Sequence, residues 1–238
     1  MHHTHKGVAI ERVVMAQGEI DDWAGARRFR FADPGRKNAI ALDTVTGLYT
    51  ALEGDPDSIF VLGSTTPDAF SAGADLRASD ENRAQISDLL YAVYGLIVSR
   101  PGPVIAVVEG LAVGGGAQLM AAADLRVAGS GARMRWVGAG HGLVVGAWIL
   151  PELVGRSIAT DLALSSRWLS AQQLVAYGLI PGVAPDPWAS AALLVEHLRS
   201  LDPWAVADFK RVTSAPGLID QLARERTRNA GWDGKATF

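Results

Sequence analysis

Two glycine-rich turns, each placed between an apolar strand and a helix, constrain the fold of this chain more than any other feature. The first turn is Ala72-Gly-Ala-Asp75, which follows the apolar segment 58–63. The second is Gly114-Gly-Gly116, which lies between the apolar segment 104–108 and an Ala-rich helix expected over 115–123. Strands and helices that alternate in this way predict an α/β core.

Further strands and helices are expected around this core. Alternating patterns favour strands, and apolar residues at helical spacing favour helices. The expected strands cover 8–16, 27–32 and 125–128, and the expected helices cover 43–53 and 82–99. After residue 170 the chain is mostly helical. We therefore expect a core domain over 1–184 and a helical region over 185–238.

Composition and charge narrow the classes of function. The 238 residues include no cysteine, which excludes disulfides, thiolate metal sites and a cysteine nucleophile. The net charge is −3 and the arginines are scattered, so no nucleic-acid partner is expected. Because no apolar run spans a bilayer and the N-terminus lacks a signal-peptide core, we expect a cytoplasmic protein without a membrane partner. His2, His3 and His5 are expected on a frayed terminus, so no metal site is predicted.

The glycine turns suggest a specific chemistry. The first N–H groups of a helix have no partner within it, and glycine lets a ligand approach them closely. Two such turns facing each other can hold one developing oxyanion from both sides. Alternatively, the glycines only permit tight turns and close helix packing. A dinucleotide-binding turn fits less well, because 114–116 lacks the G-x-G-x-x-G spacing and the acid about 20 residues later.

Several segments, in this order, resemble motifs of the crotonase (enoyl-CoA hydratase/isomerase) family. The matching segments are DPGRKNAI (33–40), AFSAGADL (69–76), GLAVGGGAQLMAAADLRVA (110–128), LVGR (153–156) and LSAQQLVAYGLI (169–180). The resemblance covers roughly residues 29–212. It implies a ClpP/crotonase spiral of ββα units within the α/β class, followed by C-terminal helices that drive trimerisation.

The resemblance also implies where a ligand binds. In the family, two backbone N–H groups form an oxyanion hole for a thioester carbonyl, and the matching positions here are Ala74 and Gly115. The family binds coenzyme A against two loops, whose matching residues are Gly35, Arg36, Lys37, Ala39, Ala72, Asp75 and Leu76. Arg36 and Lys37 are candidates for its phosphates, unless they form an ordinary solvated turn. We expect Asp75 to cap the following helix rather than to abstract protons.

The chain departs from the family at the acid/base positions. Family hydratases use two glutamates, and their positions correspond to Gln118 and Gly138. Some isomerases and a dehalogenase use an aspartate eight residues beyond the second, which corresponds to Gly146. An amide cannot accept a proton as a carboxylate does. His141 is a possible replacement base, although a lone histidine in an apolar run is more often structural.

The sequence therefore predicts a protein of acyl-CoA or fatty-acid metabolism that binds acyl-CoA thioesters and has little or no classical hydratase activity. Whether it is an enzyme stays open. One alternative is an active enoyl-CoA isomerase or lyase that uses His141 or a carboxylate from the C-terminal helices. Another is a protein-interaction module without a thioester ligand. The expected assembly is a homotrimer or hexamer, and the expected ligand is a coenzyme A thioester, with no covalently bound cofactor.

Overall fold

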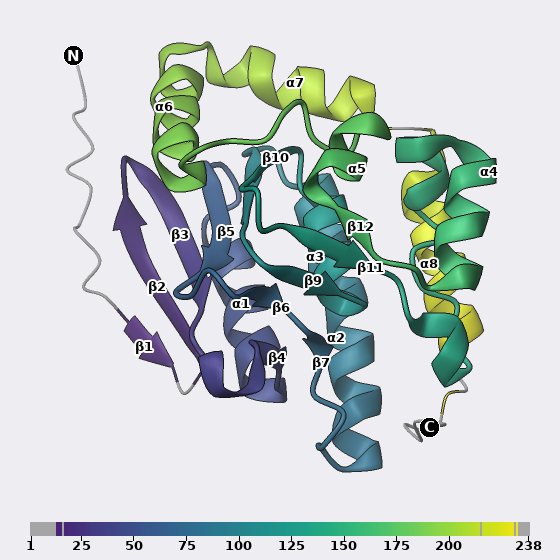
Figure 1. The fold of residues 1–238 in the computed structure, drawn as a ribbon. Helices are drawn as coiled ribbons and strands as arrows, with labels where there is room; N and C mark the ends of the chain where they lie inside the picture. The colour runs from purple at the N-terminus through teal and green to yellow at the C-terminus, as the bar shows by residue number, and fades with distance from the viewer. Residues whose placement is uncertain (1–12, 16, 215, 231, 233–238) are drawn as a thin grey trace.

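A six-stranded sheet forms one wall of the molecule (Figure 1). The computed structural model describes residues 13–15, 17–214, 216–230 and 232. In spatial order the strands are β1 (Val13–Met15), β2 (Gly18–Trp23), β3 (Ala26–Phe31), β5 (Phe60–Ser64), β8 (Val104–Val108) and β10 (Leu125–Ala128). The first three strands pair antiparallel, and β3, β5, β8 and β10 run parallel.

Two smaller sheets lie beside the large one. A four-stranded sheet has the order β12 (Leu169–Ser170), β11 (Arg133–Arg135), β9 (Leu111–Val113) and β6 (Ala69–Ser71). A two-stranded sheet pairs β4 (Ala39–Ile40) with β7 (Gly73–Ala74) in parallel. Each repeat of the spiral adds one strand to the large sheet and then one strand to a smaller sheet. The first repeats end with a helix. The expected spiral of ββα units is therefore confirmed.

The helices cover both faces of the large sheet. In chain order they are α1 (Leu42–Gly54), α2 (Asp80–Ser99), α3 (Gly115–Ala122), α4 (Leu150–Ser165), α5 (Ala171–Ala176), α6 (Pro187–Ser200), α7 (Pro203–Thr213) and α8 (Leu218–Asn229). Two short 3₁₀ turns, η1 (Pro34–Arg36) and η2 (Gly138–His141), lie in connecting loops. The main apolar core lies between the sheet and helices α1, α2 and α3. Helix α6 packs on the opposite face, where Ala191 and Val195 meet Val61, Ile105 and Val107.

The helices expected from the sequence lie within two residues of those observed for α1, α2 and α3. The strand expected over 8–16 is described only as Val13–Met15, and its earlier part lies outside the described residues. No helix among the described residues is long and apolar enough to cross a bilayer. His2, His3 and His5 also lie outside the described residues.

Candidate active site

The two glycine turns meet at one cavity. Its walls include Ala72, Ala74 and Leu76 from the first turn and Gly114 and Gly115 from the second. Residues of α2, of α3, of η2 with the loop residues on both sides of it, and of the C-terminal end of α8 and just beyond complete it. These other wall residues are Ser87, Leu90, Tyr91, Tyr94, Gln118, Val137, Gly138, His141, Leu143, Val145, Asn229 and Trp232. Residues far apart in the sequence therefore share one hollow.

Gly73 and Gly114 allow the two turns to touch. Gly73 has a φ of +88°, and a Cβ there would lie 2.7 Å from the carbonyl oxygen of Val113 and 3.2 Å from the nitrogen of Gly115. Gly114, directly before α3, has φ +52° and ψ −113°, a conformation open only to glycine. A side chain at Gly73 would force the turns apart.

The backbone N–H groups of Ala74 and Gly115 lie close together where these turns line the cavity. The N–H of Asp75 donates to the carbonyl of Ile40 at 3.0 Å. Because strand residues alternate in direction, the N–H of Ala74 points to the other side, away from β4. Gly115 is the first residue of α3, so its N–H has no partner within the helix. A Cβ on Gly115 would lie 3.7 Å from the Ala74 nitrogen, so the two predicted positions are adjacent.

Gln118 is held in place beside these turns. Its side chain is buried, and its Oε1 accepts a hydrogen bond from the indole Nε1 of Trp148 at 2.7 Å. Trp148 in turn stacks on Tyr94, with ring centroids 5.9 Å apart. Tyr94 donates its hydroxyl to the carbonyl of Gly115 at 3.2 Å. This packing fixes the orientation of the amide at the position of the first family glutamate.

The positions of the other family carboxylates are filled by neighbouring side chains. A Cβ at Gly138 would lie 2.2 Å from Cγ2 of Val145. A Cβ at Gly146 would lie 2.5 Å from the indole nitrogen of Trp136, which is buried. Apolar and aromatic groups thus occupy the space that a carboxylate would need, so neither position accepts a side chain without repacking.

A carboxylate reaches this region from α8 instead. Glu225 is only 4% exposed, and its carboxylate accepts the Tyr91 hydroxyl at 2.9 Å and the N–H groups of Gly146 and Trp148, both at 3.0 Å. Burial raises the pKa of Glu225, and these hydrogen bonds act against that shift. Sequence reasoning did not single out Glu225. A signal was present, because the buried face of α8 continues from Leu218 and Leu222 through Glu225 at helical spacing.

The Tyr91 hydroxyl is the centre of a small polar cluster. Besides donating to Glu225, it accepts a hydrogen bond from Nδ2 of Asn229 at 2.7 Å. Burial raises the pKa of Tyr91, and the nearby carboxylate of Glu225 raises it further, whereas hydrogen bonds from Asn229 and Gln118 lower it. The phenol therefore stays neutral at physiological pH. His141, which the sequence analysis gives as a possible replacement base or a structural histidine, lies in η2 and lines the same cavity, partly exposed.

The loops expected to bind coenzyme A are tied to each other by an ion pair. Arg36 contacts Asp33 at 2.6 Å and Asp75 at 2.7 Å. Asp75 does not cap α2, which corrects our expectation, because the cap is Ser79, whose Oγ accepts the N–H of Asn82. The ion pair with Arg36 occupies the Asp75 carboxylate instead.

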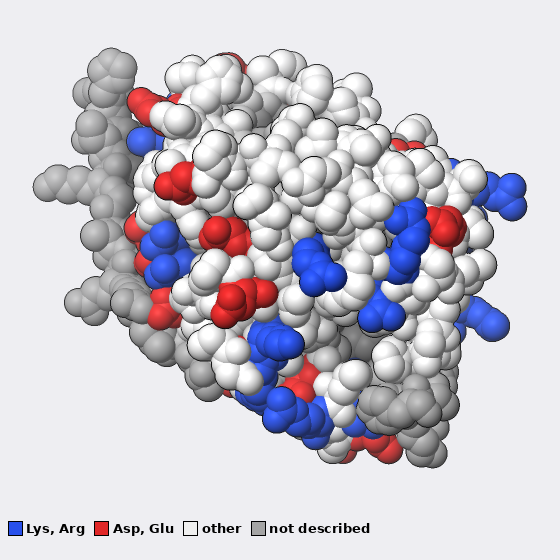
Figure 2. All heavy atoms as spheres, in the orientation of Figure 1, with Lys and Arg blue, Asp and Glu red and all other residues white. Residues whose placement is uncertain are grey.

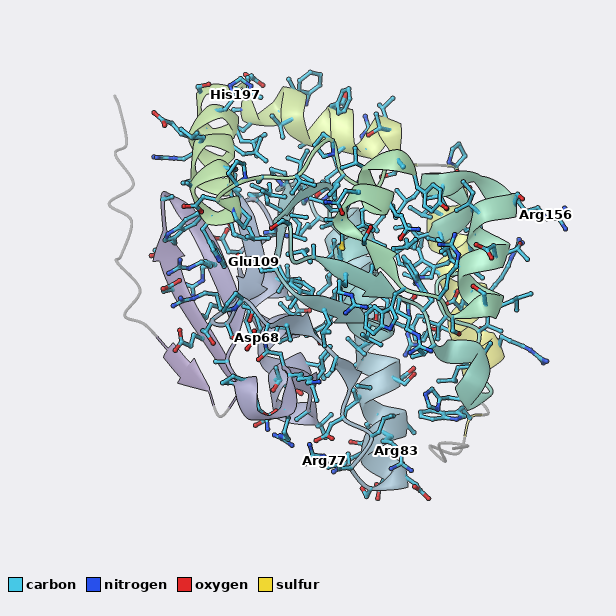
Figure 3. The ribbon with its side chains drawn as sticks, in the orientation of Figure 1. Asp68, Arg77, Arg83, Glu109, Arg156 and His197 are labelled. Carbon is cyan, nitrogen blue, oxygen red and sulfur yellow. The ribbon has the colours of Figure 1, made fainter. Side chains whose placement is uncertain are left out.

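The two loops expected to bind coenzyme A each carry an exposed cationic side chain. Lys37 is exposed, and so is Arg77 in the loop after the first turn. Figure 2 shows basic and acidic side chains side by side at the lower edge of the molecule, and Figure 3 places Arg77 and Arg83 there, beside the start of α2. Leu76 is 40% exposed beside them. Of the other predicted residues, Ala39 pairs with Gly73, and Gly35 lies in η1; neither lines the cavity.

The sequence profile of the enoyl-CoA hydratase/isomerase family matches residues 24–233, and the chain belongs to that family. Among its relatives, the probable enoyl-CoA hydratase EchA14 of Mycobacterium tuberculosis is 34% identical over 202 residues, which cover 79% of this chain and 78% of that protein. Mitochondrial methylglutaconyl-CoA hydratase of Mus musculus is 35% identical over 159 residues, covering 62% and 50% of the two chains. An enoyl-CoA hydratase/isomerase structure from Mycobacterium paratuberculosis shares the fold, with a TM-score of 0.83, 24% identity and coverage of 93% and 95%.

Proposed function

We propose that this protein binds acyl-CoA thioesters, with the thioester oxygen between the N–H groups of Ala74 and Gly115, and that it has little classical hydratase activity. The adjacency of the two turns at one cavity is the observation that carries this proposal. Two N–H donors aimed at one point stabilise an oxygen that gains negative charge. Each such donor typically lowers the activation barrier by about 2.7–4 kcal/mol.

The low hydratase activity is expected from the residues at the two positions of the family glutamates. Hydration needs groups that position a water molecule and move its protons, and each general acid or base typically contributes ~10²–10⁴ in rate. Gln118 cannot accept a proton as a carboxylate does, and Val145 fills the space beside Gly138. We therefore expect crotonyl-CoA hydration to be undetectable, or at least ~10³-fold slower than in an ordinary hydratase.

Coenzyme A would lie over the loops that Arg36 and Asp75 connect. Because Arg36 is already paired with two carboxylates, its charge is largely neutralised locally. Lys37 and Arg77 are the exposed cations nearby, and they are better placed to meet phosphate groups. Leu76, beside the cavity mouth, would contact the pantetheine arm.

Calorimetric titration with a medium-chain acyl-CoA tests the proposal. Gly115→Val should block approach to the N–H and weaken binding much more than Gln118→Ala, which trims a side chain beside the carbonyl. Circular dichroism on the same samples separates lost binding from lost folding. Equal affinity of a folded Gly115→Val variant and the parent would show that the thioester is not seated between the turns. The interaction-module alternative would then lead.

A homotrimer, or a dimer of trimers, is the assembly that we propose. The support is the apolar surface of the C-terminal helices, where Trp204 is 74% exposed, Phe209 71% and Val212 70%, all on α7. Leu193 on α6 is similarly exposed, at 67%. An apolar face of this kind marks an interaction site. A stable monomer at micromolar concentration in light scattering would contradict the trimer.

A further inference from the structure

One stretch of the cavity wall is held by side chains rather than by backbone pairing. Residues 143–148, between η2 and α4, belong to no helix or strand, and two of them, Leu143 and Val145, line the cavity. Peptide N–H groups in such a wall need partners, because a buried N–H without one costs free energy. The partners of three alternate N–H groups, those of residues 144, 146 and 148, are side chains of α8.

Two residues of α8, one helical turn apart, provide these bonds. Asn229 binds the backbone of Val144 on both sides, because its Oδ1 accepts the N–H at 3.0 Å and its Nδ2 donates to the carbonyl at 2.6 Å. Glu225 accepts the N–H groups of Gly146 and Trp148, both at 3.0 Å. Both side chains are buried, so water competes little for these bonds. Together they form a clamp on the loop, the α8 clamp.

The residue between the clamped peptide groups is Val145. The backbones of both its neighbours, Val144 and Gly146, are bonded to the α8 clamp. Its own side chain lines the cavity and packs on Gly138, where a Cβ would lie 2.2 Å from Cγ2 of Val145. The position of this part of the cavity wall is therefore set from α8 and not by the loop alone.

We propose that the α8 clamp determines which acyl groups the cavity admits, by holding Val145 beside Cβ of the acyl chain. The inference rests on the proposed function, because the thioester oxygen must lie between Ala74 and Gly115. Hydration adds water at Cβ, and the resemblance places the second glutamate of a hydratase at Gly138, where the side chain of Val145 stands instead. The cavity therefore selects acyl thioesters that are unbranched at Cβ. Glu225, behind the wall, acts as a positioning residue.

Selection of this kind requires a wall that does not yield. One methyl or methylene group changes binding in a filled apolar pocket by about 10–200-fold, provided that the pocket cannot widen to accept it. A loop without bonds of its own would move aside at little cost. The α8 clamp supplies four hydrogen bonds, two on each side of Val145, which resist that movement.

Calorimetric titration with hexanoyl-CoA and with 3-methylhexanoyl-CoA, which differ by one methyl group at Cβ, tests the clamp. The parent should bind the branched ligand at least ~10-fold more weakly. Val145→Ala removes the wall itself and should bring the two affinities to within about 3-fold of each other. Glu225→Gln leaves one acceptor oxygen where two N–H groups need one each, so the loop is loosened and the affinity ratio should fall at least ~3-fold.

Asp88→Asn is the matched control for Glu225→Gln. Asp88 also joins α2 to α8, through Arg226 at 2.7 Å, but both side chains are exposed and neither bonds to residues 143–148. The affinity ratio should stay at its parental value. In the double variant Glu225→Gln with Val145→Ala, the ratio should equal that of Val145→Ala alone, because the clamp acts through that side chain. A general loss of stability would weaken both ligands alike and would not move the ratio.

The outcomes separate the clamp from the proposed function. Equal binding of the two ligands to the parent, or a parental ratio in folded Val145→Ala or Glu225→Gln, would overturn the inference and leave thioester binding intact. Absence of binding of either ligand to the parent would overturn the proposed function itself. Circular dichroism confirms folding of each variant. If Glu225→Gln does not fold, Glu225→Asp decides the matter, because its shorter side chain cannot reach both N–H groups.

Discussion

The two sides of the cavity are built from different parts of the polypeptide. One side is backbone: the turns at 72–75 and 114–116 present N–H groups, and glycines allow them to touch. The other side is made of side chains: Gln118 and Val145 line it at the places of the two family glutamates, and Glu225 lies behind it, bonded to the N–H of Gly146. Backbone donors depend on the path of the chain and tolerate little change. Side-chain chemistry can move to another element, provided that the new element packs at the same place.

The largest loss of folding stability is expected when a side chain is added to a glycine turn, on the side of the cavity that the backbone forms. Gly73→Ala places a methyl group 2.7 Å from the carbonyl oxygen of Val113, at a φ of +88°. Strain and overpacking together should lower the free energy of unfolding by about 2–5 kcal/mol. Urea unfolding measures the loss. Gly54→Ala at the end of α1 is the control, because its Cβ meets nothing within 4 Å. If both variants have the same stability, the close approach of the turns is not required.

A smaller loss of stability is expected from Gly138→Ala, which tests whether Val145 fills the space beside Gly138. Gly138→Ala should destabilise the fold by about 1–3 kcal/mol, because its Cβ overlaps Val145. Adding Val145→Ala should recover part of that loss, with a coupling of about 0.5–3 kcal/mol in a double-mutant cycle. Gly140→Ala, in the same 3₁₀ turn with open space around its Cβ, should be nearly neutral. Strict additivity of the two substitutions would show that Val145 does not occupy the space.

The buried carboxylate should also appear in the pH dependence of stability. Burial raises the pKa of Glu225 in the folded state above its unfolded value, so its favourable contribution is complete below the unfolded pKa and is lost as pH rises through the folded pKa. The difference in unfolding free energy between the parent and Glu225→Gln should therefore fall as pH rises above about 4.5. Subtracting the variant cancels other buried carboxyls such as Asp124, whose pKa burial also raises. A difference that stays constant with pH would contradict this environment.

The smallest effect is expected on the rate of crotonyl-CoA hydration, when a carboxylate is restored at position 118 alone. Gln118→Glu keeps an oxygen for the indole N–H of Trp148, so the fold should be maintained. Crotonyl-CoA hydration should nevertheless gain less than ~10²-fold, because Val145 still fills the space of the second family glutamate beside Gly138. A steady-state assay at saturating crotonyl-CoA measures it. Activity typical of a two-glutamate hydratase in this single variant would show that the filled space at Gly138 does not limit hydration.

The backbone side could be predicted from the sequence because its signals are local. The segment 69–76 and the triplet 114–116 each combine a strand, a turn and a helix start within a few residues. The resemblance to the family indicates Ala74 and Gly115 as the two positions, and the folded chain brings them together. Asp75 was the exception, since an acid before a helix looks like a cap, whereas the folded chain pairs it with Arg36, 39 residues away.

On the side of the cavity that side chains form, only the missing carboxylates could be predicted from the sequence. The sequence shows that positions 118 and 138 lack carboxylates, but not that Val145 fills the second space. Glu225 and Tyr91 are 134 residues apart, and no pattern near either residue indicates the other. Such pairings depend on how α8 packs against α2, which is decided by the tertiary fold rather than by local sequence.

The attachment of Glu225 to residues much earlier in the chain has a consequence for the order in which the protein folds. Its partners Tyr91 and Gly146 precede it by 134 and 79 residues, so each contact closes a long loop. Contacts of this kind form late, because loop closure costs entropy before the contact is made. Synthesis reinforces this order, since the N-terminal parts of a chain generally fold first. A nascent chain that has emerged through about residue 170 already holds both glycine turns, yet the wall of the cavity is completed only when α8 docks.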